Sequence, residues 1–166
     1  MFITKSPSTP KQPPPPVTVC IGAISHPMVI VATDRMITSG DIQFEQQQPK
    51  IFTIAHNILA LISGDIATQT ALVDSTRAAV KRTDAKTVKG VATIFADTYA
   101  AYCRRKAEAE VLKPFGLSSV EDLMARRRWS SDIVHEILCQ IQHAAEHQDV
   151  ATIIAGQDEF GPHLYV

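Results

Sequence analysis

Apolar residues follow two different periods along the chain. In the first third, short apolar runs alternate with polar or turn-forming clusters, a pattern typical of β-strands joined by tight connections. In the middle, apolar residues recur every three or four positions over longer stretches, as in amphipathic helices. The strands predicted in the first third cover residues 17–24, 28–34, 51–54 and 58–62.

The rest of the chain is predicted to be helical and then to return to strands. Helices are expected at 67–82, from 87 to about 111, in a short segment opening near Ser118, and from 131 to about 148; further strands are expected at 150–154 and 162–166. The order of strands, helices and strands with short connections favours an α+β fold, in which helices are layered on an antiparallel sheet.

The first 16 residues differ in composition from the rest. They hold six of the ten prolines, four of them consecutive at the end of the segment. Proline cannot donate to a β-ladder and favours extended backbone. We therefore predict a disordered or extended tail, or a pro-segment, at residues 1–16, followed by one domain at residues 17–166.

Composition narrows the possible partners and the compartment. The net charge of −1 argues against general electrostatic binding to nucleic acid or to an anionic membrane. Three widely spaced cysteines form no paired motif, which indicates free thiols in a reducing compartment, so the expected location is cytoplasmic. No apolar run approaches the ~18 residues of a membrane span.

Four residues with useful chemistry occur at regular spacing near the strand ends: Thr18, Asp34, Lys50 and Gly64, separated by 16, 16 and 14 positions. If their strands pair as neighbours, one end of a sheet carries a hydroxyl, a carboxylate and an ammonium group. A threonine at a chain N-terminus can use its own α-amine as general base, and a lysine can stabilise the developing alkoxide. The acid would keep the lysine charged, and a glycine N–H could bind an oxyanion.

These residues carry a family resemblance. The segment from Thr18 to about Arg77 resembles the first part of a proteasome β-type subunit, of the N-terminal nucleophile hydrolase superfamily. Residues 31–40 match the motif apolar-Ala-x-Asp-x-x-x-Thr-x-Gly, and Lys50 and Gly64 fall at the family's spacing without a gap. The resemblance implies an αββα sandwich of antiparallel sheets flanked by helices. Because the chain stops before a later glycine-rich stretch of the family, the domain is expected to be C-terminally truncated.

The resemblance also implies roles for these residues. Thr18 would be the nucleophile and, once freed, its own base; Lys50 would tune it, Asp34 would hold Lys50, and the Gly64 N–H would bind the oxyanion. The implied activity is that of a threonine-type endopeptidase, which hydrolyses amide bonds of peptides or proteins through an acyl-enzyme ester, with no metal or cofactor. A homo-oligomeric ring and an ATP-dependent unfoldase partner are implied in the same way.

A second interpretation stays open. Val17 stands before Thr18, where self-cleaving family members carry glycine, and a β-branched residue is stiff in the tight turn that self-cleavage requires. Without cleavage there is no free α-amine. The alternative is therefore a non-catalytic ring or scaffold subunit in which Thr18 is never processed.

A separate cluster recurs every four residues on the last predicted helix: His135, Cys139, His143 and His147. Neighbours in this row share a helix face, so an adjacent pair could bind Zn²⁺. The whole row would span about 18 Å and cannot form one tetrahedral site. A half-buried polar edge, at a subunit contact for example, is the preferred interpretation.

Overall fold

The computed structural model describes residues 19–34, 36–39, 42–45, 49–125, 129–146 and 150–166. Its elements are, in chain order, β1 (Cys20–Ser25), β2 (Met28–Thr33), β3 (Met36–Ser39), β4 (Ile42–Glu45), β5 (Ile51–Ala55), β6 (Ile58–Ile62), α1 (Ile66–Thr83), α2 (Val88–Leu112), the 3₁₀ turn η1 (Lys113–Phe115), α3 (Val120–Ala125), α4 (Ser131–Glu146), β7 (Thr152–Asp158) and β8 (Gly161–Tyr165).

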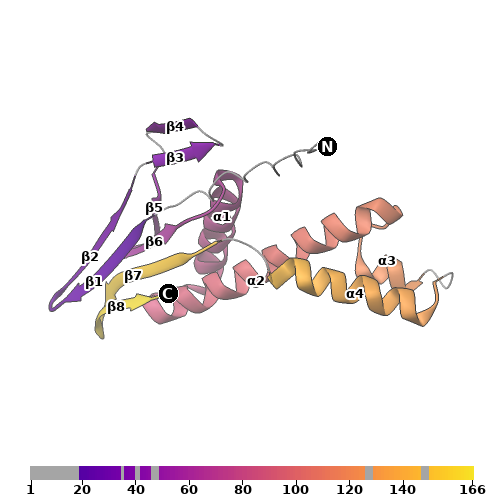
Figure 1. Cartoon of the computed structure of the whole chain (residues 1–166). Coiled ribbons are helices and arrows are strands. Elements are labelled where there is room, and N and C mark those ends of the chain that lie inside the picture. Colours follow the sequence, from indigo (N-terminus) through magenta and orange to yellow (C-terminus); the bar gives the residue numbers. More distant parts are fainter. Residues whose placement is uncertain (1–18, 35, 40–41, 46–48, 126–128, 147–149) are drawn as a thin grey trace, which may run out of the picture.

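A four-stranded antiparallel sheet with the order β5-β6-β7-β8 lies beside helices α1 and α2 (Figure 1). Ala60 of β6 lies opposite Phe52 of β5 and Ile154 of β7. Helices α1 and α2 cover one face of this sheet, because each turns an apolar stripe towards it. The apolar side chains buried between this sheet and the two helices form a cluster that we call the body core: Ile54, Ile58, Ala60, Ile62, Leu72, Val73, Val80, Val88, Val91, Phe95 and Ile154.

The β1–β2 hairpin lies against the other face of the sheet, where it contacts β7 and β8. Gly22 permits this approach, since a Cβ at that position would lie 2.3 Å from Leu164 Cδ1. Because side chains alternate along a strand, the opposite face of the hairpin points away from the sheet. Ile21 and Ile30 on that outer face are 57% and 54% exposed.

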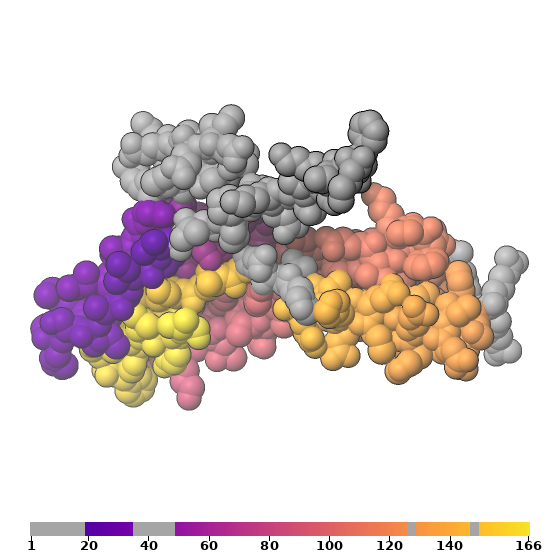
Figure 2. All heavy atoms as spheres, in the orientation of Figure 1, coloured from indigo at the N-terminus to yellow at the C-terminus, as the bar shows by residue number. Residues whose placement is uncertain are grey.

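The C-terminal half of α2, η1, α3 and α4 form a helical arm that extends away from the sheet (Figures 1 and 2). The arm has a core of its own, made by Ala107, Leu112, Leu117, Leu123, Ile137 and Ile141. Gly116 ends η1 with a φ of 65°, a left-handed conformation that favours glycine. Within the described ranges, no helix has both the length and the apolar character needed to cross a membrane.

The α+β class predicted from the sequence is confirmed, and the two long helices begin and end within one residue of the predicted bounds. Other boundaries were predicted wrongly. Strands β3 and β4, which pair from Met36 with Glu45 to Ser39 with Ile42, were not predicted from the sequence, because each is only four residues long. Strand β7 begins at Thr152 and continues to Asp158, because its pairing with β6 extends to Gly156.

Candidate active site

An ion pair joins Asp34 and Lys50, two of the four residues singled out by their spacing. Lys50 Nζ lies 2.5 Å from Asp34 Oδ1, and the lysine side chain is only 8% exposed. Asp34 directly follows β2 and Lys50 directly precedes β5, and these strands belong to different sheets. The expectation that the strands pair as neighbours in one sheet was therefore wrong: the ion pair bridges the two layers.

The same carboxylate also contacts the backbone at the start of the described chain. Asp34 Oδ2 accepts a hydrogen bond of 3.3 Å from the N–H of Val19, and the N–H of Asp34 donates to the carbonyl of Val19 at 3.1 Å. Val19 is the residue that follows Thr18 in the sequence. Thr18 and Val17 lie outside the described residues, so the proposed nucleophile is not part of the geometry seen here.

Gly64 lies at the same end of the β5–β6 pair as Lys50, because the N–H of Ile62 donates to the Lys50 carbonyl at 3.3 Å. Its φ of 121° is one that L side chains rarely adopt, so the turn requires glycine. The Gly64 N–H donates to no residue in the described part of the chain. An N–H of this kind can donate a hydrogen bond to an anionic oxygen.

The turn that carries Gly64 is held from both sides. The side-chain amide of Gln69, on α1, donates to the Gly64 carbonyl at 2.9 Å. On the other side, the N–H of Ser63 donates to the Ala151 carbonyl at 2.9 Å, and the Ser63 hydroxyl accepts from the Ala151 N–H at 3.0 Å. The direction of the Gly64 N–H is therefore set by the sheet and by the helix together.

Asp65 fixes the start of α1 directly after this turn. Its carboxylate accepts from the Thr68 N–H at 2.9 Å, as an N-cap does, and also from the Thr68 hydroxyl. The Thr68 hydroxyl lies 2.9 Å from the Tyr102 hydroxyl of α2. Burial raises the pKa of Asp65, but the hydrogen bonds from Thr68 outweigh it, so the pKa is lowered and the cap stays ionised at neutral pH.

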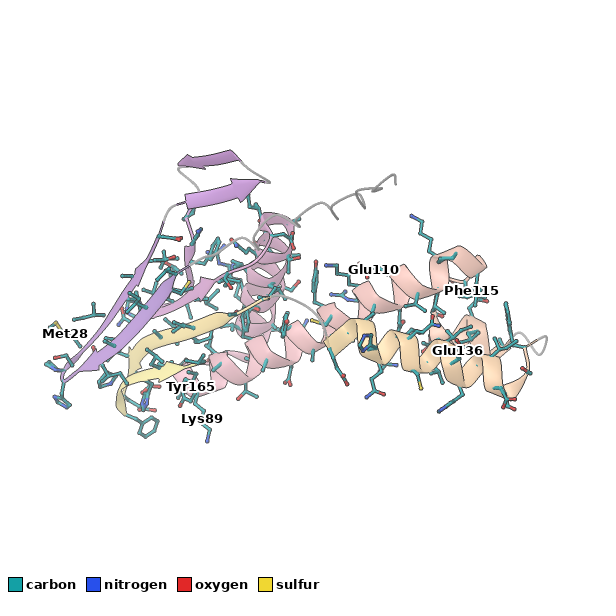
Figure 3. The ribbon with its side chains drawn as sticks, viewed as in Figure 1. Met28, Lys89, Glu110, Phe115, Glu136 and Tyr165 are labelled. Carbon is teal, nitrogen blue, oxygen red and sulfur yellow. The ribbon has the colours of Figure 1, made fainter. Side chains whose placement is uncertain are left out.

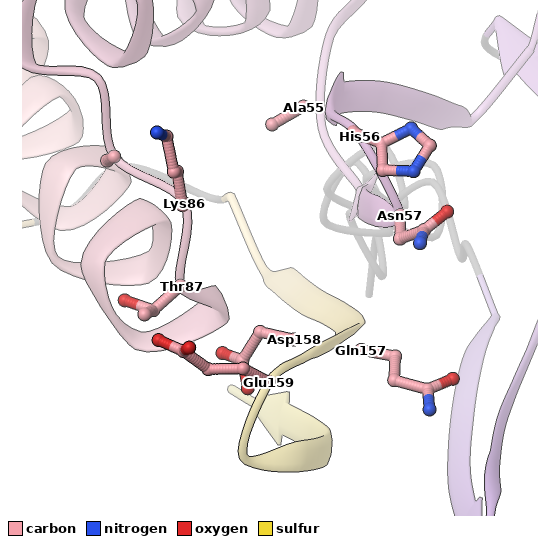
Figure 4. Close-up of a pocket in the computed structure, with 9 residues that line it drawn as sticks. Ala55, His56, Asn57, Lys86, Thr87, Gln157, Asp158 and Glu159 are labelled. Carbon is pink, nitrogen blue, oxygen red and sulfur yellow. The ribbon is translucent and has the colours of Figure 1, made fainter.

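Two hollows lie away from the ion pair. An open pocket of about 700 Å³ is formed by the β5–β6 turn, the α1–α2 connection and the β7–β8 turn (Figure 4). It contains His56, Lys86 and Asp158, and it sits at the end of β5 opposite Lys50. A groove of about 540 Å³ lies between β2 and the sheet and is lined mostly by apolar groups, among them Val31 and Leu59.

Asp158 connects the β7–β8 turn to helix α2. Its carboxylate accepts from the N–H of Val88 at 2.8 Å, from the N–H of Phe160 at 3.0 Å, and lies 3.3 Å from His163 Nε2. The Val88 hydrogen bond is the main reason why the pKa of Asp158 is lowered. These contacts give the Asp158 carboxylate a structural role, since they join the β7–β8 turn to α2. The pocket beside it is therefore not the preferred active site.

The residues that hold the Gly64 turn in place were not predicted from the sequence. Ser63 and Gln69 hold the Gly64 turn, but neither belongs to the spacing pattern that led to Asp34 and Lys50. Gln69 could have been found from the sequence, because it is a polar residue at a position that the helical period of α1 places on the buried face, and buried polar side chains are usually hydrogen-bonded. In the structure Gln69 is 6% exposed. Ser63 could not have been found in this way, since it contacts Ala151, 88 positions later.

Comparison with known families identifies the family of the chain. The family model described as Proteasome subunit matches residues 17–124, which include β1 to α2 and most of α3. The chain therefore belongs to the proteasome subunit family, within the N-terminal nucleophile hydrolase superfamily, and the resemblance seen in the sequence is confirmed. No curated protein matches the sequence.

Proposed function

We propose that this chain is a threonine-type peptidase subunit that cleaves amide bonds of peptides or proteins, with Thr18 as its nucleophile. The observation that carries the proposal is the Asp34–Lys50 ion pair, formed between two layers directly beside the backbone of Val19. The buried Lys50 ammonium group is held by Asp34, and the same carboxylate contacts Val19, the residue that follows Thr18. An ammonium group held close to a hydroxyl can stabilise the alkoxide that such a nucleophile forms.

In this proposal Thr18 supplies both the nucleophile and its base, and the other three residues have one role each. The Thr18 α-amine, exposed by cleavage after Val17, removes the proton of the Thr18 hydroxyl, and the hydroxyl oxygen attacks the substrate carbonyl. Lys50 stabilises the developing negative charge on that hydroxyl, and Asp34 holds the Lys50 ammonium group in place through their ion pair. The Gly64 N–H donates to the oxyanion. The acyl-enzyme ester is then hydrolysed by water, and no metal or cofactor takes part.

The proposal includes the assembly that the family resemblance implies: a homo-oligomeric ring in the cytoplasm, fed by an ATP-dependent unfoldase, with the domain completed as an αββα sandwich. The half-exposed outer face of the β1–β2 hairpin supports this part, since a soluble protein rarely leaves a contiguous apolar sheet face uncovered. The predicted C-terminal truncation stays a prediction.

Val17 favours a second candidate function. If the chain is not cleaved before Thr18, the α-amine stays in a peptide bond and cannot act as a base. The chain would then be a non-catalytic ring or scaffold subunit that keeps the Asp34–Lys50 pair for structural reasons only. The N-terminal residue of the mature protein separates the two functions.

The experiment compares two forms of the protein: the full-length chain and a chain made to begin at Thr18 by removal of a fusion partner. Intact mass shows whether the full-length chain loses its first 17 residues. Hydrolysis of unstructured peptides is then measured for both forms and for Thr18→Ala in each. The matched control is Thr70→Ala, because the exposed Thr70 hydroxyl donates only to the Ile66 carbonyl of its own helix.

We expect the chain beginning at Thr18 to hydrolyse peptides, and Thr18→Ala to lower the rate by at least about 10³-fold, whereas Thr70→Ala leaves it unchanged. Activity that survives Thr18→Ala would show that Thr18 is not the nucleophile. A full-length chain that is never shortened, together with an active chain beginning at Thr18, supports the scaffold function for the native protein. Inactivity of both forms rejects the peptidase.

A further inference from the structure

Two metal-ligand side chains lie together on the exposed face of α4. His135 Nε2 is 3.7 Å from Cys139 Sγ, and both residues are exposed. They point away from the arm core, to which α4 contributes Ile137 and Ile141. Figure 3 shows α4 in the arm, with the neighbouring Glu136 labelled. No part of the proposed peptidase site involves this helix.

The separation of the two atoms suits a metal ion without rearrangement. Zn²⁺ bonds imidazole nitrogen at about 2.0–2.1 Å and thiolate sulfur at about 2.3 Å in tetrahedral geometry, so the two ligand atoms stand about 3.5 Å apart. The observed 3.7 Å differs little from that value. Residues four apart share a helix face, which fixes the pair at the spacing that chelation requires.

We propose that His135 and Cys139 form a two-residue binding site for a zinc-type divalent cation. On binding, the Cys139 thiol loses its proton to solvent and its thiolate forms the metal–sulfur bond, while neutral His135 donates a nitrogen lone pair. Asp132 lies three residues before His135 on the same helix face and adds negative charge that favours a cation. Water fills the remaining positions.

The site is a chelate of two residues and not a closed structural centre. Over the residues that the structure describes, no group of three or more His, Cys, Asp or Glu side chains could hold a metal ion together. His143 lies one turn beyond Cys139, but a rise of about 1.5 Å per residue places it about 12 Å along the axis from His135. One ion cannot bind both histidines. His147 lies outside the described residues.

The test uses the full-length protein and Co²⁺, which replaces Zn²⁺ and makes the coordination visible. A thiolate ligand gives a sulfur-to-cobalt charge-transfer band in the near ultraviolet. We expect this band to saturate at one equivalent of Co²⁺ and to disappear on addition of Zn²⁺. Cys139→Ser should abolish the band, and His135→Ala should weaken Co²⁺ binding by at least about tenfold.

Two matched variants make the test specific. His143→Ala removes the next histidine of the row, and Cys20→Ser removes a cysteine in the β1–β2 hairpin; both should bind Co²⁺ like the wild type. All the helical positions changed are exposed, so circular dichroism should show unchanged helix content. The proposal is overturned if the wild type gives no charge-transfer band, if the band survives Cys139→Ser, or if His135→Ala and His143→Ala weaken binding equally.

Discussion

The β1–β2 hairpin and the four-stranded sheet show how the same sequence pattern leads to different burial. Strand β6 and strands β1 and β2 all appear in the sequence as short apolar runs. Ile62 of β6 has no exposed surface, because α1 and α2 cover its face of the sheet, whereas Ile30 of β2 is 54% exposed. An apolar run therefore predicts a strand, but the elements packed on each face decide how much the strand contributes to stability.

The candidate active site lies between these two regions. Lys50 comes from the start of the well-packed sheet, and Asp34 comes from the end of the hairpin, which is packed on one face only. The ion pair thus depends on how the hairpin docks on the sheet. Changes in the two regions should differ in size, and changes at the ion pair should fall between them.

The largest expected effect is in the body core. Ile62→Ala removes a fully buried side chain and should lower the free energy of unfolding by about 2–5 kcal/mol, since burial is lost and a cavity is left. Ile30→Ala, the matched change on the outer face of the hairpin, should cost less than about 1 kcal/mol. Urea unfolding measures both values.

Equal costs for Ile62→Ala and Ile30→Ala would contradict the comparison. Such a result would mean that the outer face of the hairpin is covered in solution, as it would be in an assembled ring. Repeating the Ile30→Ala measurement at several protein concentrations then shows whether a second copy supplies the cover, because association makes apparent stability depend on concentration.

An intermediate effect is expected at the ion pair between the layers. Asp34→Asn removes the negative charge opposite Lys50, whose side chain is 8% exposed, and should cost about 1–3 kcal/mol. The control is Asp74→Asn, because Asp74 pairs with Arg77 at 3.9 Å on the solvent side of α1. Exposed pairs contribute little, so this change should stay within about 0.5 kcal/mol. Urea unfolding measures both variants. If Asp74→Asn lowers the free energy of unfolding as much as Asp34→Asn does, the buried ion pair contributes no more than an exposed one.

A smaller effect is expected where α1 begins. Asp65→Ala removes the N-cap hydrogen bonds to Thr68 and should lower the free energy of unfolding by about 1 kcal/mol. Asp65→Ser keeps a capping oxygen and should recover much of the loss. Thermal unfolding followed by circular dichroism compares the three proteins. If Asp65→Ser is no more stable than Asp65→Ala, the Asp65 carboxylate does not stabilise the protein by capping α1.

The pH dependence of stability should follow from two carboxylates. The pKa of Asp158 is lowered mainly by the Val88 N–H, and that of Asp65 is lowered by Thr68 against the opposing effect of burial. The unfolded chain binds these protons at a higher pH than the folded chain does. The stabilisation is therefore present at neutral pH and is lost as the pH falls below about 4, through the folded pKa values.

Urea unfolding at pH 7, 5, 4 and 3 tests this dependence. We expect stability to change little from pH 7 to 5 and to fall below that range, with a smaller fall in Asp158→Asn, which no longer titrates at that position. A wild-type stability that stays constant down to pH 3 would show that neither carboxylate is stabilised in the folded state.

Much of the local structure could be predicted from single residues and short patterns. The helix from Val88 to Leu112 was found by its apolar period, and the β5–β6 hairpin by two apolar runs around Ala55, His56 and Asn57. The β3–β4 hairpin was not predicted, because Met36–Ser39 has no apolar alternation and the alternation in Ile42–Glu45 is only four residues long.

The capping of α3 shows a finer limit. Ser119 accepts from the Asp122 N–H at 3.2 Å, and Asp122 accepts from the Ser118 N–H at 3.3 Å, so a reciprocal cap is formed. The spacing of Ser118 and Glu121 predicts a capping box with Ser118 as the capping residue, whereas in the structure Ser119 takes that role. Leu117 is buried in the arm core, and the path of the backbone after it decides which serine reaches the start of α3.

By itself the sequence determined the α+β class, the long helices, the family and the register that contains Asp34, Lys50 and Gly64. These depend on local periods and on fixed spacings, which need no knowledge of the partner surface. Only the tertiary structure decided that Asp34 and Lys50 meet across two sheets, that Gln69 and Ser63 hold the Gly64 turn, and that the hairpin packs on one face. Contacts between residues far apart in the chain set these outcomes, because packing selects one arrangement among many that the same local patterns allow.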